Sequence, residues 1–424
     1  MDKTTIQTLI DKVIGKKGLI RVPSWWMRKV LMQMADWVQE GDDANNEKIV
    51  KVSEDAEKLR NLTLPYTLVS GTGEVNIDGN KVSFTDADKQ LIYITGAVKF
   101  KKGDGSYNDF ITYIHIPHID IRSQGRDMSS MFAYCSGLTS LNLSGLNTSA
   151  VTNMASMFES CSGLTSLDLS GLNTSAVTSM DSMFESCSGL TSLDLSGFNT
   201  SAVTSMSRMF NKCSKLTSLD LSGFNTSAVT SMEMMFNKCS NLTSLDLSGF
   251  DTSAVTSMSR MFAYCSGLTS LNLSGLNTSA VTNMLSMFYN CSGLTSLNLS
   301  GLNTSAVTNM EMMFNNCSKL TSLNLSSFDT SAVTSMGYMF AYCSNLTSLI
   351  LGPNFLKTSK YDYVDFSYCT KWTNDTVVTS LVTNSYDRAT AGLKTMTLKL
   401  STNTKAALTD EQKAAITAKG YTIA

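Results

Sequence analysis

The stretch Met131-Phe-Ala-Tyr-Cys-Ser-Gly-Leu-Thr-Ser-Leu-Asn-Leu-Ser-Gly-Leu-Asn-Thr-Ser-Ala-Val-Thr-Asn-Met154 decides the fold, because close copies of it return every 26 residues until about position 364. All 10 cysteines of the chain mark this period, at Cys135, Cys161, Cys187, Cys213, Cys239, Cys265, Cys291, Cys317, Cys343 and Cys369. A fixed period of this size is typical of a stacked solenoid, in which each unit buries its apolar face against its neighbours. We therefore expect an array whose core grows lengthwise.

Each unit contains two apolar patterns. Leu138, Leu141 and Leu143 fit a short strand, in which Leu141 and Leu143 point to the same side. A second set recurs at helical steps, and Gly145 and the run 147–149 supply a turn and helix caps before it. That second set is Val151, Met154, Met157, Phe158 and Cys161. The predicted fold class is an α/β solenoid, a leucine-rich-repeat array of 26-residue strand-turn-helix units.

The flanking segments predict four parts of the chain: an N-terminal helical segment at 1–62, a small β-rich cap at 63–126, the repeats at 127–364 and an α/β C-terminal cap at 365–424. An Asp78-Gly79 turn between alternating apolar residues predicts a hairpin in the first cap. The run 113–121 predicts a strand that leads into the array. In the second cap, Thr409 and Gln412 form a capping-box pattern and Gly420 a helix end.

The N-terminal segment carries two candidate attachment features. Trp25, Trp26 and Trp37 fit either a small helical core or an anchor that docks into a larger assembly, since Trp is favoured at interfaces. The second feature is a seam of apolar residues at alternating three- and four-residue steps, which fits a short coiled coil or an ordinary amphipathic helix. The seam consists of Ile49, Val52, Ala56 and Leu59. A coiled coil here would make the chain a homo-oligomer, with a trimer favoured.

Charge and composition exclude several classes of function. The formal net charge is -2, and only 17 of the 68 charged side chains lie between Met131 and Leu356, so no long-range field favours nucleic acid or an anionic membrane. No apolar run approaches the length of a membrane span, so we expect no membrane insertion. The first residues also lack the pattern of a secretion signal, so we expect any export to follow another route.

The cysteines and histidines predict no metal site. Each Cys follows Met-Phe at the same apolar position of its unit, which favours a ladder of buried thiols, with disulfides between some adjacent units as the alternative. No Cys has a Cys or His at ligand spacing. The only 2 histidines, His115 and His118, fit polar positions on an edge strand. We expect no cofactor.

The repeat as a whole resembles a known family. The phrase Met-Phe-x-x-Cys-Ser-x-Leu-Thr-Ser-Leu-x-Leu-Ser-x-Phe-[Asn/Asp]-Thr-Ser-x-Val-Thr-x-Met is similar to the BspA-type leucine-rich repeat of bacterial surface proteins, and it covers 131–364. The stretch Pro23-Ser-Trp-Trp-Met-Arg-Lys-Val-Leu, together with the C-terminal end, resembles structural tail and fibre proteins of tailed phages of gut bacteria. These resemblances imply a protein that contacts surfaces.

Catalysis is not expected. No Ser-His-Asp, Cys-His, paired-carboxylate or phosphate-loop pattern is present in the repeats, and both His lie outside them. Every Ser and Cys of the array has a sister at the same place in other units, so none is chemically singled out. The sequence therefore predicts a protein that is not an enzyme.

Two exposed rows compete as the contact surface. The strand row is monotonous and suits a polymer with its own repeat; the other row varies between units, although plain solvated positions explain both. The strand row comprises Thr139, Asn142, Asp168, Asp194, Asp220 and Asp246. The varied row includes Tyr134, Tyr264, Tyr289, Tyr338 and Tyr342.

The first functional hypothesis is a receptor-binding component of a phage virion, such as a tail fibre or a tail-tip or capsid-attached protein. Its N-terminus would bind other virion proteins, and its repeats would bind a host surface protein or polysaccharide. The alternatives are a BspA-type adhesin on the bacterial cell surface and a structural decoration protein without a receptor. The expected location is the virion, with the bacterial cell surface as the alternative.

Overall fold

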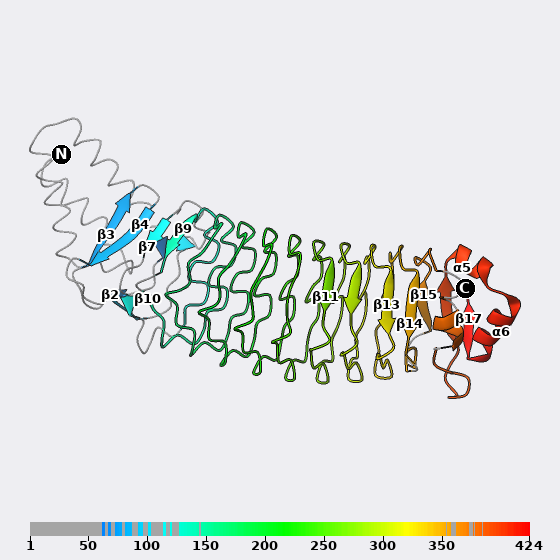
Figure 1. Cartoon of the computed structure of the whole chain (residues 1–424). Coiled ribbons are helices and arrows are strands. Elements are labelled where there is room, and N and C mark those ends of the chain that lie inside the picture. Colours follow the sequence, from blue (N-terminus) through cyan, green and yellow to red (C-terminus); the bar gives the residue numbers. More distant parts are fainter. Residues whose placement is uncertain are drawn as a thin grey trace, which may run out of the picture. The chain divides into compact units, whose positions relative to one another are not determined.

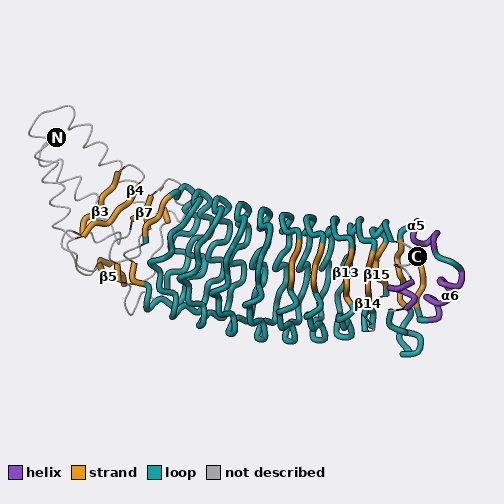
Figure 2. Tube along the Cα trace, viewed as in Figure 1, coloured by secondary structure: helices purple, strands orange, loops and turns teal. Residues whose placement is uncertain are grey.

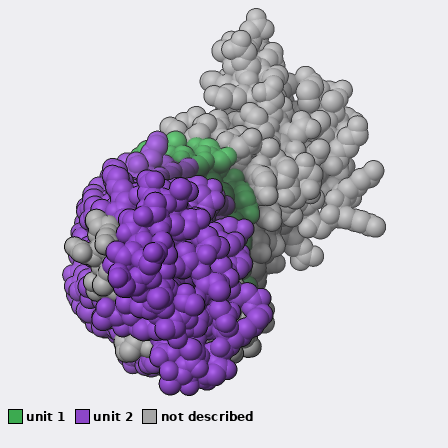
Figure 3. Space-filling model, turned by 90° about the vertical axis from the view of Figure 1, so that its right-hand side faces the viewer, with its two compact units in different colours: residues 1–176 green, residues 177–424 purple. Residues whose placement is uncertain are grey.

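The structure is a computed structural model that describes the strands between 62 and 120, and residues 127–143, 146–352, 354–357, 362–372, 376, 378–383 and 385–424. The chain divides into two compact units, residues 1–176 and 177–424 (Figure 3). The predicted attachment residues Trp25, Trp26, Trp37, Ile49, Val52, Ala56 and Leu59 lie outside the described residues.

In the residues that the structure describes, the first unit contains ten short strands. They are β1 (Leu62–Thr63), β2 (Thr67–Leu68), β3 (Gly73–Asp78), β4 (Lys81–Asp86), β5 (Ile92–Thr95), β6 (Lys101–Lys102), β7 (Tyr113–His115), β8 (Ile119–Asp120), β9 (Ser140–Asn142) and β10 (Leu146–Asn147). β3 and β4 form an antiparallel pair in which Asp78 lies opposite Lys81, which confirms the predicted hairpin. The run 113–121, predicted as one strand, contains the two strands β7 and β8, which belong to different sheets. β7 pairs in parallel with β9, and β8 with β10, so this run does pair with the first repeat.

The second unit is a stack of 26-residue rungs that lie one behind another (Figure 1). Its strands are short, and most of each rung is loop (Figure 2). The strands of the rungs are β11 (Ser270–Asn272), β12 (Ser296–Asn298), β13 (Ser322–Leu325) and β14 (Ser348–Leu351). β11 pairs with β12 and β13 with β14, in parallel and with each residue opposite its sister in the next repeat, as Leu271 lies opposite Leu297.

The core of each rung is built from the same apolar positions. Most Leu of the strand segments and the Met, Phe and Cys of the following segment are buried, and rungs stack these residues on their own copies. Phenylalanine rings of successive rungs from Phe184 to Phe340 lie 5.7 to 6.0 Å apart and nearly parallel. Offset-stacked rings at this distance are favourable beyond the apolar area that they bury. The 26-residue period therefore works by self-stacking of identical side chains.

The prediction of a helix in each repeat is wrong. Within the described parts of 127–357, the residues expected to be helical form a chain of tight turns, which we call the turn segment (Ser179–Cys187 in one rung). Two residues of each turn segment, four apart, adopt a left-handed backbone, such as Ser182 with a φ of 55° and Ser186 with a φ of 61°. An α-helix excludes such residues, because left-handed backbone is costly for any side chain with a Cβ.

The backbone hydrogen bonds explain why turns replace the helix. Alternate N–H groups point along the stack and donate to carbonyls of the next rung, and the N–H groups between them close turns within the rung. The first kind joins Met180 to Ser205, Ser182 to Ser207, Phe184 to Met209 and Ser186 to Asn211. The second kind joins Met183 to Met180, Glu185 to Ser182 and Cys187 to Phe184. The turn segment thus satisfies its backbone and also ties rungs together, which a helix with internal bonds cannot do.

The Asn-Thr-Ser run links rungs instead of capping a helix. In one rung, Asn199 Oδ1 accepts the N–H of Ser201 at 3.1 Å, which forms an Asx turn. The buried Thr200 hydroxyl donates to the carbonyl of Asn225 in the next rung at 2.8 Å and accepts the N–H of Asn225 at 2.8 Å. The same donation recurs from Thr148 to Thr330 in most rungs.

The C-terminal end continues the stack with a parallel sheet and short helices. Its elements are β15 (Tyr363–Phe366), a π-helix η1 (Val378–Thr383), β16 (Met396–Leu400), α5 (Thr402–Ala407), α6 (Asp410–Ala418) and β17 (Tyr421–Ile423). The predicted capping box is present at the start of α6, between Thr409 and Gln412. Gly420 follows that helix with a φ of 87°, as expected for a helix end. The sheet has the order β15-β16-β17.

Candidate functional site

The strand segment of each rung (Thr191–Leu195 in one rung) presents a polar row. Leu193 and Leu195 are buried, whereas Thr191, Ser192 and Asp194 are exposed. The exposed Thr hydroxyls bond along the stack, as Thr217 donates to the carbonyl of Thr191 at 3.3 Å. The predicted strand-row residues Thr139, Asp168, Asp194, Asp220 and Asp246 are all exposed, and Asn142 is half-buried. The row is a regular polar surface.

Each aspartate of the row is held by its own rung. Asp220 Oδ1 accepts the N–H of Ser222 at 2.9 Å. Hydrogen bonds from the N–H and the hydroxyl of Ser222 hold the pKa of Asp220 below its usual value. The neighbouring carboxylate of Asp194 opposes this shift but is the smaller effect. Asp246 has the same arrangement with Ser248 and Asp220. Stacked carboxylates of like charge repel one another and cannot donate hydrogen bonds to each other.

The row changes from aspartate to asparagine after Asp246. Asn298 Nδ2 donates to Asn272 Oδ1 at 3.1 Å, a bond between rungs that a carboxylate pair cannot form. The strands β11 and β12 begin at this change. The Asp-to-Asn change therefore coincides with a tighter pairing of neighbouring rungs.

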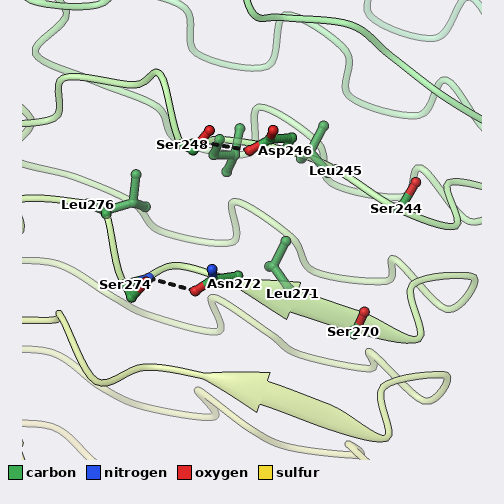
Figure 4. A pocket seen from close by; sticks show the side chains of 11 residues that line it. Ser244, Leu245, Asp246, Ser248, Ser270, Leu271, Asn272, Ser274 and Leu276 are labelled. Carbon is green, nitrogen blue, oxygen red and sulfur yellow. Dashed lines mark hydrogen bonds between the residues drawn. The ribbon is translucent and has the colours of Figure 1, made fainter.

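A shallow recess lies at this change (Figure 4). Its volume is about 350 Å³, and its walls come from two consecutive rungs. Hydroxyl, carboxylate and amide groups surround the half-buried Leu245 and the buried Leu271. The lining side chains include Ser244, Asp246, Ser248, Ser270, Asn272 and Ser274. Such a recess has hydrogen-bonding groups but neither an aromatic ring nor a cation.

The turn segments carry the variable side chains. Their left-handed positions form nine pairs, from Ser130 and Tyr134 to Tyr338 and Tyr342. Four of these residues are Lys or Arg, four are Tyr, and none is acidic. Glycine, asparagine and aspartate tolerate this backbone best, and only Asn290 and Asn316 follow that preference. The chain thus places Arg, Lys and Tyr where their backbone conformation is costly.

The predicted tyrosines divide into separate groups. Tyr134 is half-buried and its hydroxyl donates to Glu159 at 2.7 Å. Tyr264 is exposed, and Tyr289 packs edge-on against it with ring centroids 5.1 Å apart. Hydrogen bonding to Tyr264 raises the pKa of Tyr289, because it stabilises the protonated phenol.

A second aromatic group lies nearer the C-terminus. Tyr338 and Tyr342 are 49% and 55% exposed, the largest exposed fractions among the large apolar side chains of the described residues. Tyr342 contacts Tyr368 with ring centroids 4.5 Å apart. Tyr368 was not among the predicted contact residues, although it follows the repeat pattern one residue before Cys369.

Sequence reasoning also missed the cations beside the tyrosines. Lys238 and Arg260 are exposed on successive turn segments, and Lys238 Nζ lies 5.3 Å from the ring centroid of Tyr264. Arg208 and Lys212 precede them in the same rows. These residues could have been found by comparing sister repeats, because the side chains at the left-handed positions differ from one unit to the next. The predicted aspartates and tyrosines lie on different segments of the rung, separated by buried Cys and Leu.

The cysteines offer no reactive group. All ten are free and buried. The thiol of Cys239 donates to the carbonyl of Phe210 at 3.1 Å, and Cys265 and Cys291 repeat this contact with the preceding rungs. Burial raises the pKa of Cys239 to about 12, so its nucleophilic thiolate form is scarce at neutral pH. The prediction of a buried thiol ladder is confirmed.

Among the described residues, no group of three or more His, Cys, Asp or Glu is arranged to hold a metal ion. In the same residues, no helix has the length and apolar character needed to cross a membrane.

Solved structures with leucine-rich repeats are similar to this chain. A leucine-rich cell surface protein from Faecalibacterium prausnitzii A2-165 has 16% identity and a TM-score of 0.32, over 83% of this chain and 98% of that one. A leucine-rich-repeat protein from Bacteroides ovatus ATCC 8483 has 14% identity and a TM-score of 0.24, over 74% and 98%. One from Eubacterium ventriosum ATCC 27560 has 16% identity and a TM-score of 0.26, over 73% and 83%.

A search of curated proteins finds no match. A family model does match, over residues 120–194, 190–291 and 268–377, which together exceed half of the chain. Its matched range coincides with the predicted bacterial repeats, whereas the resemblance of the chain ends to phage proteins stays a prediction. The chain therefore belongs to the DUF285 family, described as a Mycoplasma protein of unknown function.

Proposed function

We propose that this chain is a non-enzymatic adhesion protein that contacts a surface through the turn segments of its repeat array. The observation that carries the proposal is the placement of Tyr, Arg and Lys at left-handed turn positions. Each such residue costs on the order of 1 kcal/mol of backbone strain relative to a residue suited to that conformation. Stability alone favours Gly or Asn there, so binding is the better explanation for bulky side chains.

The contrast between core and surface supports this choice of segment. Val, Met, Phe and Cys repeat without change in the buried positions of consecutive rungs, and Met209, Phe210 and Cys213 are nearly inaccessible to solvent. The exposed turn positions of the same rungs differ from one repeat to the next. Tyr and Arg are also the residues that supply most binding energy at protein interfaces. An array of such contacts gains strength by multivalency.

Whether the protein makes this contact from a phage particle or from a bacterial cell is a separate proposal. The phage particle rests on the resemblance of both chain ends to phage structural proteins, and the alternatives are the bacterial cell surface and a decoration protein without a receptor. The function proposed for the turn segments is the same in both settings. In neither do we expect a chemical reaction of the bound surface.

A matched pair of variants tests the proposal. In the first, Tyr264, Tyr338 and Tyr342 become Asn, which suits the left-handed backbone and should preserve folding. In the second, Asp194, Asp220 and Asp246 become Asn, which changes the strand row by the same number of residues. Binding of the fluorescently labelled full-length chain to a panel of gut bacteria is measured by flow cytometry.

We expect the tyrosine variant to lose cell binding and the aspartate variant to keep it, with both melting at or above the wild-type temperature. Loss of binding only in the aspartate variant would move the contact to the strand row. A wild-type chain that binds none of the cells would overturn the adhesion proposal. Mass spectrometry of surface glycans incubated with the chain should show no new cleavage products.

A further inference from the structure

Four cations and one tyrosine form a patch on three consecutive rungs of the second unit. This cationic–aromatic patch consists of Arg208, Lys212, Lys238, Arg260 and Tyr264, all exposed. Backbone hydrogen bonds set the spacing, because Lys212 N donates to the carbonyl of Asn237 and Lys238 N to that of Ala263, each at 2.7 Å. The patch residues therefore follow one another in adjacent rows, one rung at a time.

The cations of the patch are only partly neutralised. Arg208 Nη2 lies 3.9 Å from Glu233, and Lys212 Nζ lies 3.5 Å from Glu185. Neither Lys238 nor Arg260 has a carboxylate within 4.0 Å among the described residues. Exposed ion pairs are weak and exchange readily with other anions. The patch thus offers two uncompensated cations and two that an incoming anion can recruit.

The tyrosine supplies a flat surface beside these charges. The Tyr264 ring is 38% exposed, held from one side by Tyr289 and approached by the Lys238 ammonium. A tyrosine ring combines an apolar face with a hydroxyl that forms hydrogen bonds. The face of a sugar ring carries C–H groups between hydroxyls, so it can stack on such a ring while the hydroxyls bond to neighbouring polar groups.

We propose that the cationic–aromatic patch binds an acidic polysaccharide, a chain of sugar rings that carry carboxylate or sulfate groups. This inference rests on the proposed adhesion function and names its ligand class and its site. The tyrosine stacks on a sugar ring, and Lys238 and Arg260 pair with acidic groups of the same polymer. A polymer can bridge cations of several rungs at once, so that weak single contacts add up.

The charge of the patch fits a sparsely charged polymer better than a nucleic acid. DNA carries one charge per about 1.7 Å of helix axis, and proteins that bind it commonly neutralise six or more phosphates. Only two cations of the patch are uncompensated, and the carboxylates of Glu185 and Glu233 lie 3.5 and 3.9 Å from the other two. A dense polyanion would be repelled by these carboxylates, whereas a polysaccharide with separated acidic groups can pair with Lys238 and Arg260 alone.

The test measures binding of the full-length chain to immobilised polymers by biolayer interferometry. The probes are hyaluronate and polygalacturonate, whose carboxylates are separated by whole sugar rings, with uncharged dextran and an oligodeoxythymidylate as comparisons. The patch variant carries Lys238→Gln and Arg260→Gln. Its matched control, with the same change in net charge, carries Lys319→Gln and Lys405→Gln, and circular dichroism checks that both fold.

We expect the wild type to bind both acidic glycans and not dextran, with affinity that falls as salt rises. The patch variant should bind at least about tenfold more weakly, while the control stays within about twofold. Tyr264→Ala should weaken binding without changing the salt dependence. Equal binding by the patch variant and the control, or equal binding of dextran, would overturn the inference.

Two further outcomes separate the inference from the adhesion proposal. If the wild type binds bacterial cells but neither acidic glycan, the ligand class is wrong and the adhesion proposal stands. If the oligodeoxythymidylate binds more tightly than both glycans, the patch is a nucleic-acid site and the inference fails. A wild type that binds neither cells nor glycans refutes both proposals.

Discussion

The buried threonine of the Asn-Thr-Ser run provides the sharpest test of how the rungs are joined. We predict that Thr200→Val strongly destabilises the protein, although valine has almost the same shape. The hydroxyl of Thr200 makes two hydrogen bonds to the backbone of Asn225, one as donor and one as acceptor. Valine removes both and leaves the N–H and the carbonyl of Asn225 without these partners.

The magnitude follows from the two lost contacts. A typical hydrogen bond contributes about 0.5–1.5 kcal/mol, and a buried group left without a partner costs about 1–3 kcal/mol. Because Thr200 is 1% exposed, water cannot easily replace its hydroxyl. We therefore expect Thr200→Val to lower the free energy of unfolding by about 2–4 kcal/mol. Thr200→Ser, which keeps the hydroxyl, should cost only about 1 kcal/mol for the lost methyl group.

Thr204→Val is the matched control, four residues further along the same rung. The exposed Thr204 hydroxyl donates to the carbonyl of Thr178 at 3.2 Å, and that carbonyl already accepts the N–H of Thr204 at 2.9 Å. Removing this hydroxyl leaves no backbone group without a partner, so the cost should be about 0.5 kcal/mol or less. Both variants are compared with the wild type by urea unfolding followed by circular dichroism.

Hydrogen exchange gives a local measurement beside the global one. The amide of Asn225 should exchange faster in Thr200→Val and stay protected in Thr200→Ser and Thr204→Val. Nearest-neighbour contacts dominate the stability of stacked repeats, so the loss should centre on this rung and the next. Equal destabilisation by Thr200→Val and Thr204→Val, or an unchanged Asn225 amide, would refute the reasoning.

Three further predictions concern the turn segment and the core. Ser186→Gly should stabilise the protein by about 0.5–1 kcal/mol, because glycine relieves the strain of the left-handed backbone at this position. In the same urea assay, Ser192→Gly in the strand segment should destabilise the protein. The thiols should not react with Ellman's reagent at pH 8 in the native protein and should react fully in urea, since burial raises the pKa of Cys239 to about 12; rapid labelling of the native chain would contradict this. Asn211→Ala should cost about 2–3 kcal/mol, because its side chain donates a hydrogen bond to Glu185 in the preceding rung and accepts one from Asn237 in the following rung. Asn237→Ala should cost less, because it removes an amide whose Oδ1 has no hydrogen-bond partner among the described residues; a larger loss for Asn237→Ala would disprove this ranking.

The sequence predicts the core of this fold well because a repeat displays each buried position many times. Cys239, Phe236 and Leu242 are buried at the places that the 26-residue period assigns to them. Outside the array, local sequence patterns that occur only once also predicted the structure correctly. The capping box at Thr409 and the hairpin turn after Asp78 depend on a few neighbouring residues, and both are present.

The candidate site was harder to predict because its residues are exceptions to the repeat. The tyrosines were visible as large exposed side chains, but Lys238 and Arg260 resemble ordinary solvated residues in the sequence. Their proposed role rests on two structural facts, the left-handed backbone at Lys238 and Arg260 and the absence of a nearby carboxylate among the described residues. Neither fact is encoded by local composition.

The incorrect prediction of a helix shows that the spacing of apolar residues alone does not decide the local backbone structure. Apolar residues at steps of three and four, such as Met180, Met183, Phe184 and Cys187, satisfy an α-helix, but they also satisfy a ribbon of tight turns that buries every third or fourth side chain. The two solutions differ in where the backbone N–H groups go. A helix keeps these N–H groups within the segment, whereas the turns direct alternate ones to carbonyls of the next rung.

In an isolated segment the helix has the lower free-energy cost, since it needs no left-handed residues. In a stack, each rung is met by an identical edge of carbonyls, and the turns gain bonds at every interface. The repetition that reveals the fold is therefore also the reason that a single repeat, considered alone, predicts the wrong local structure.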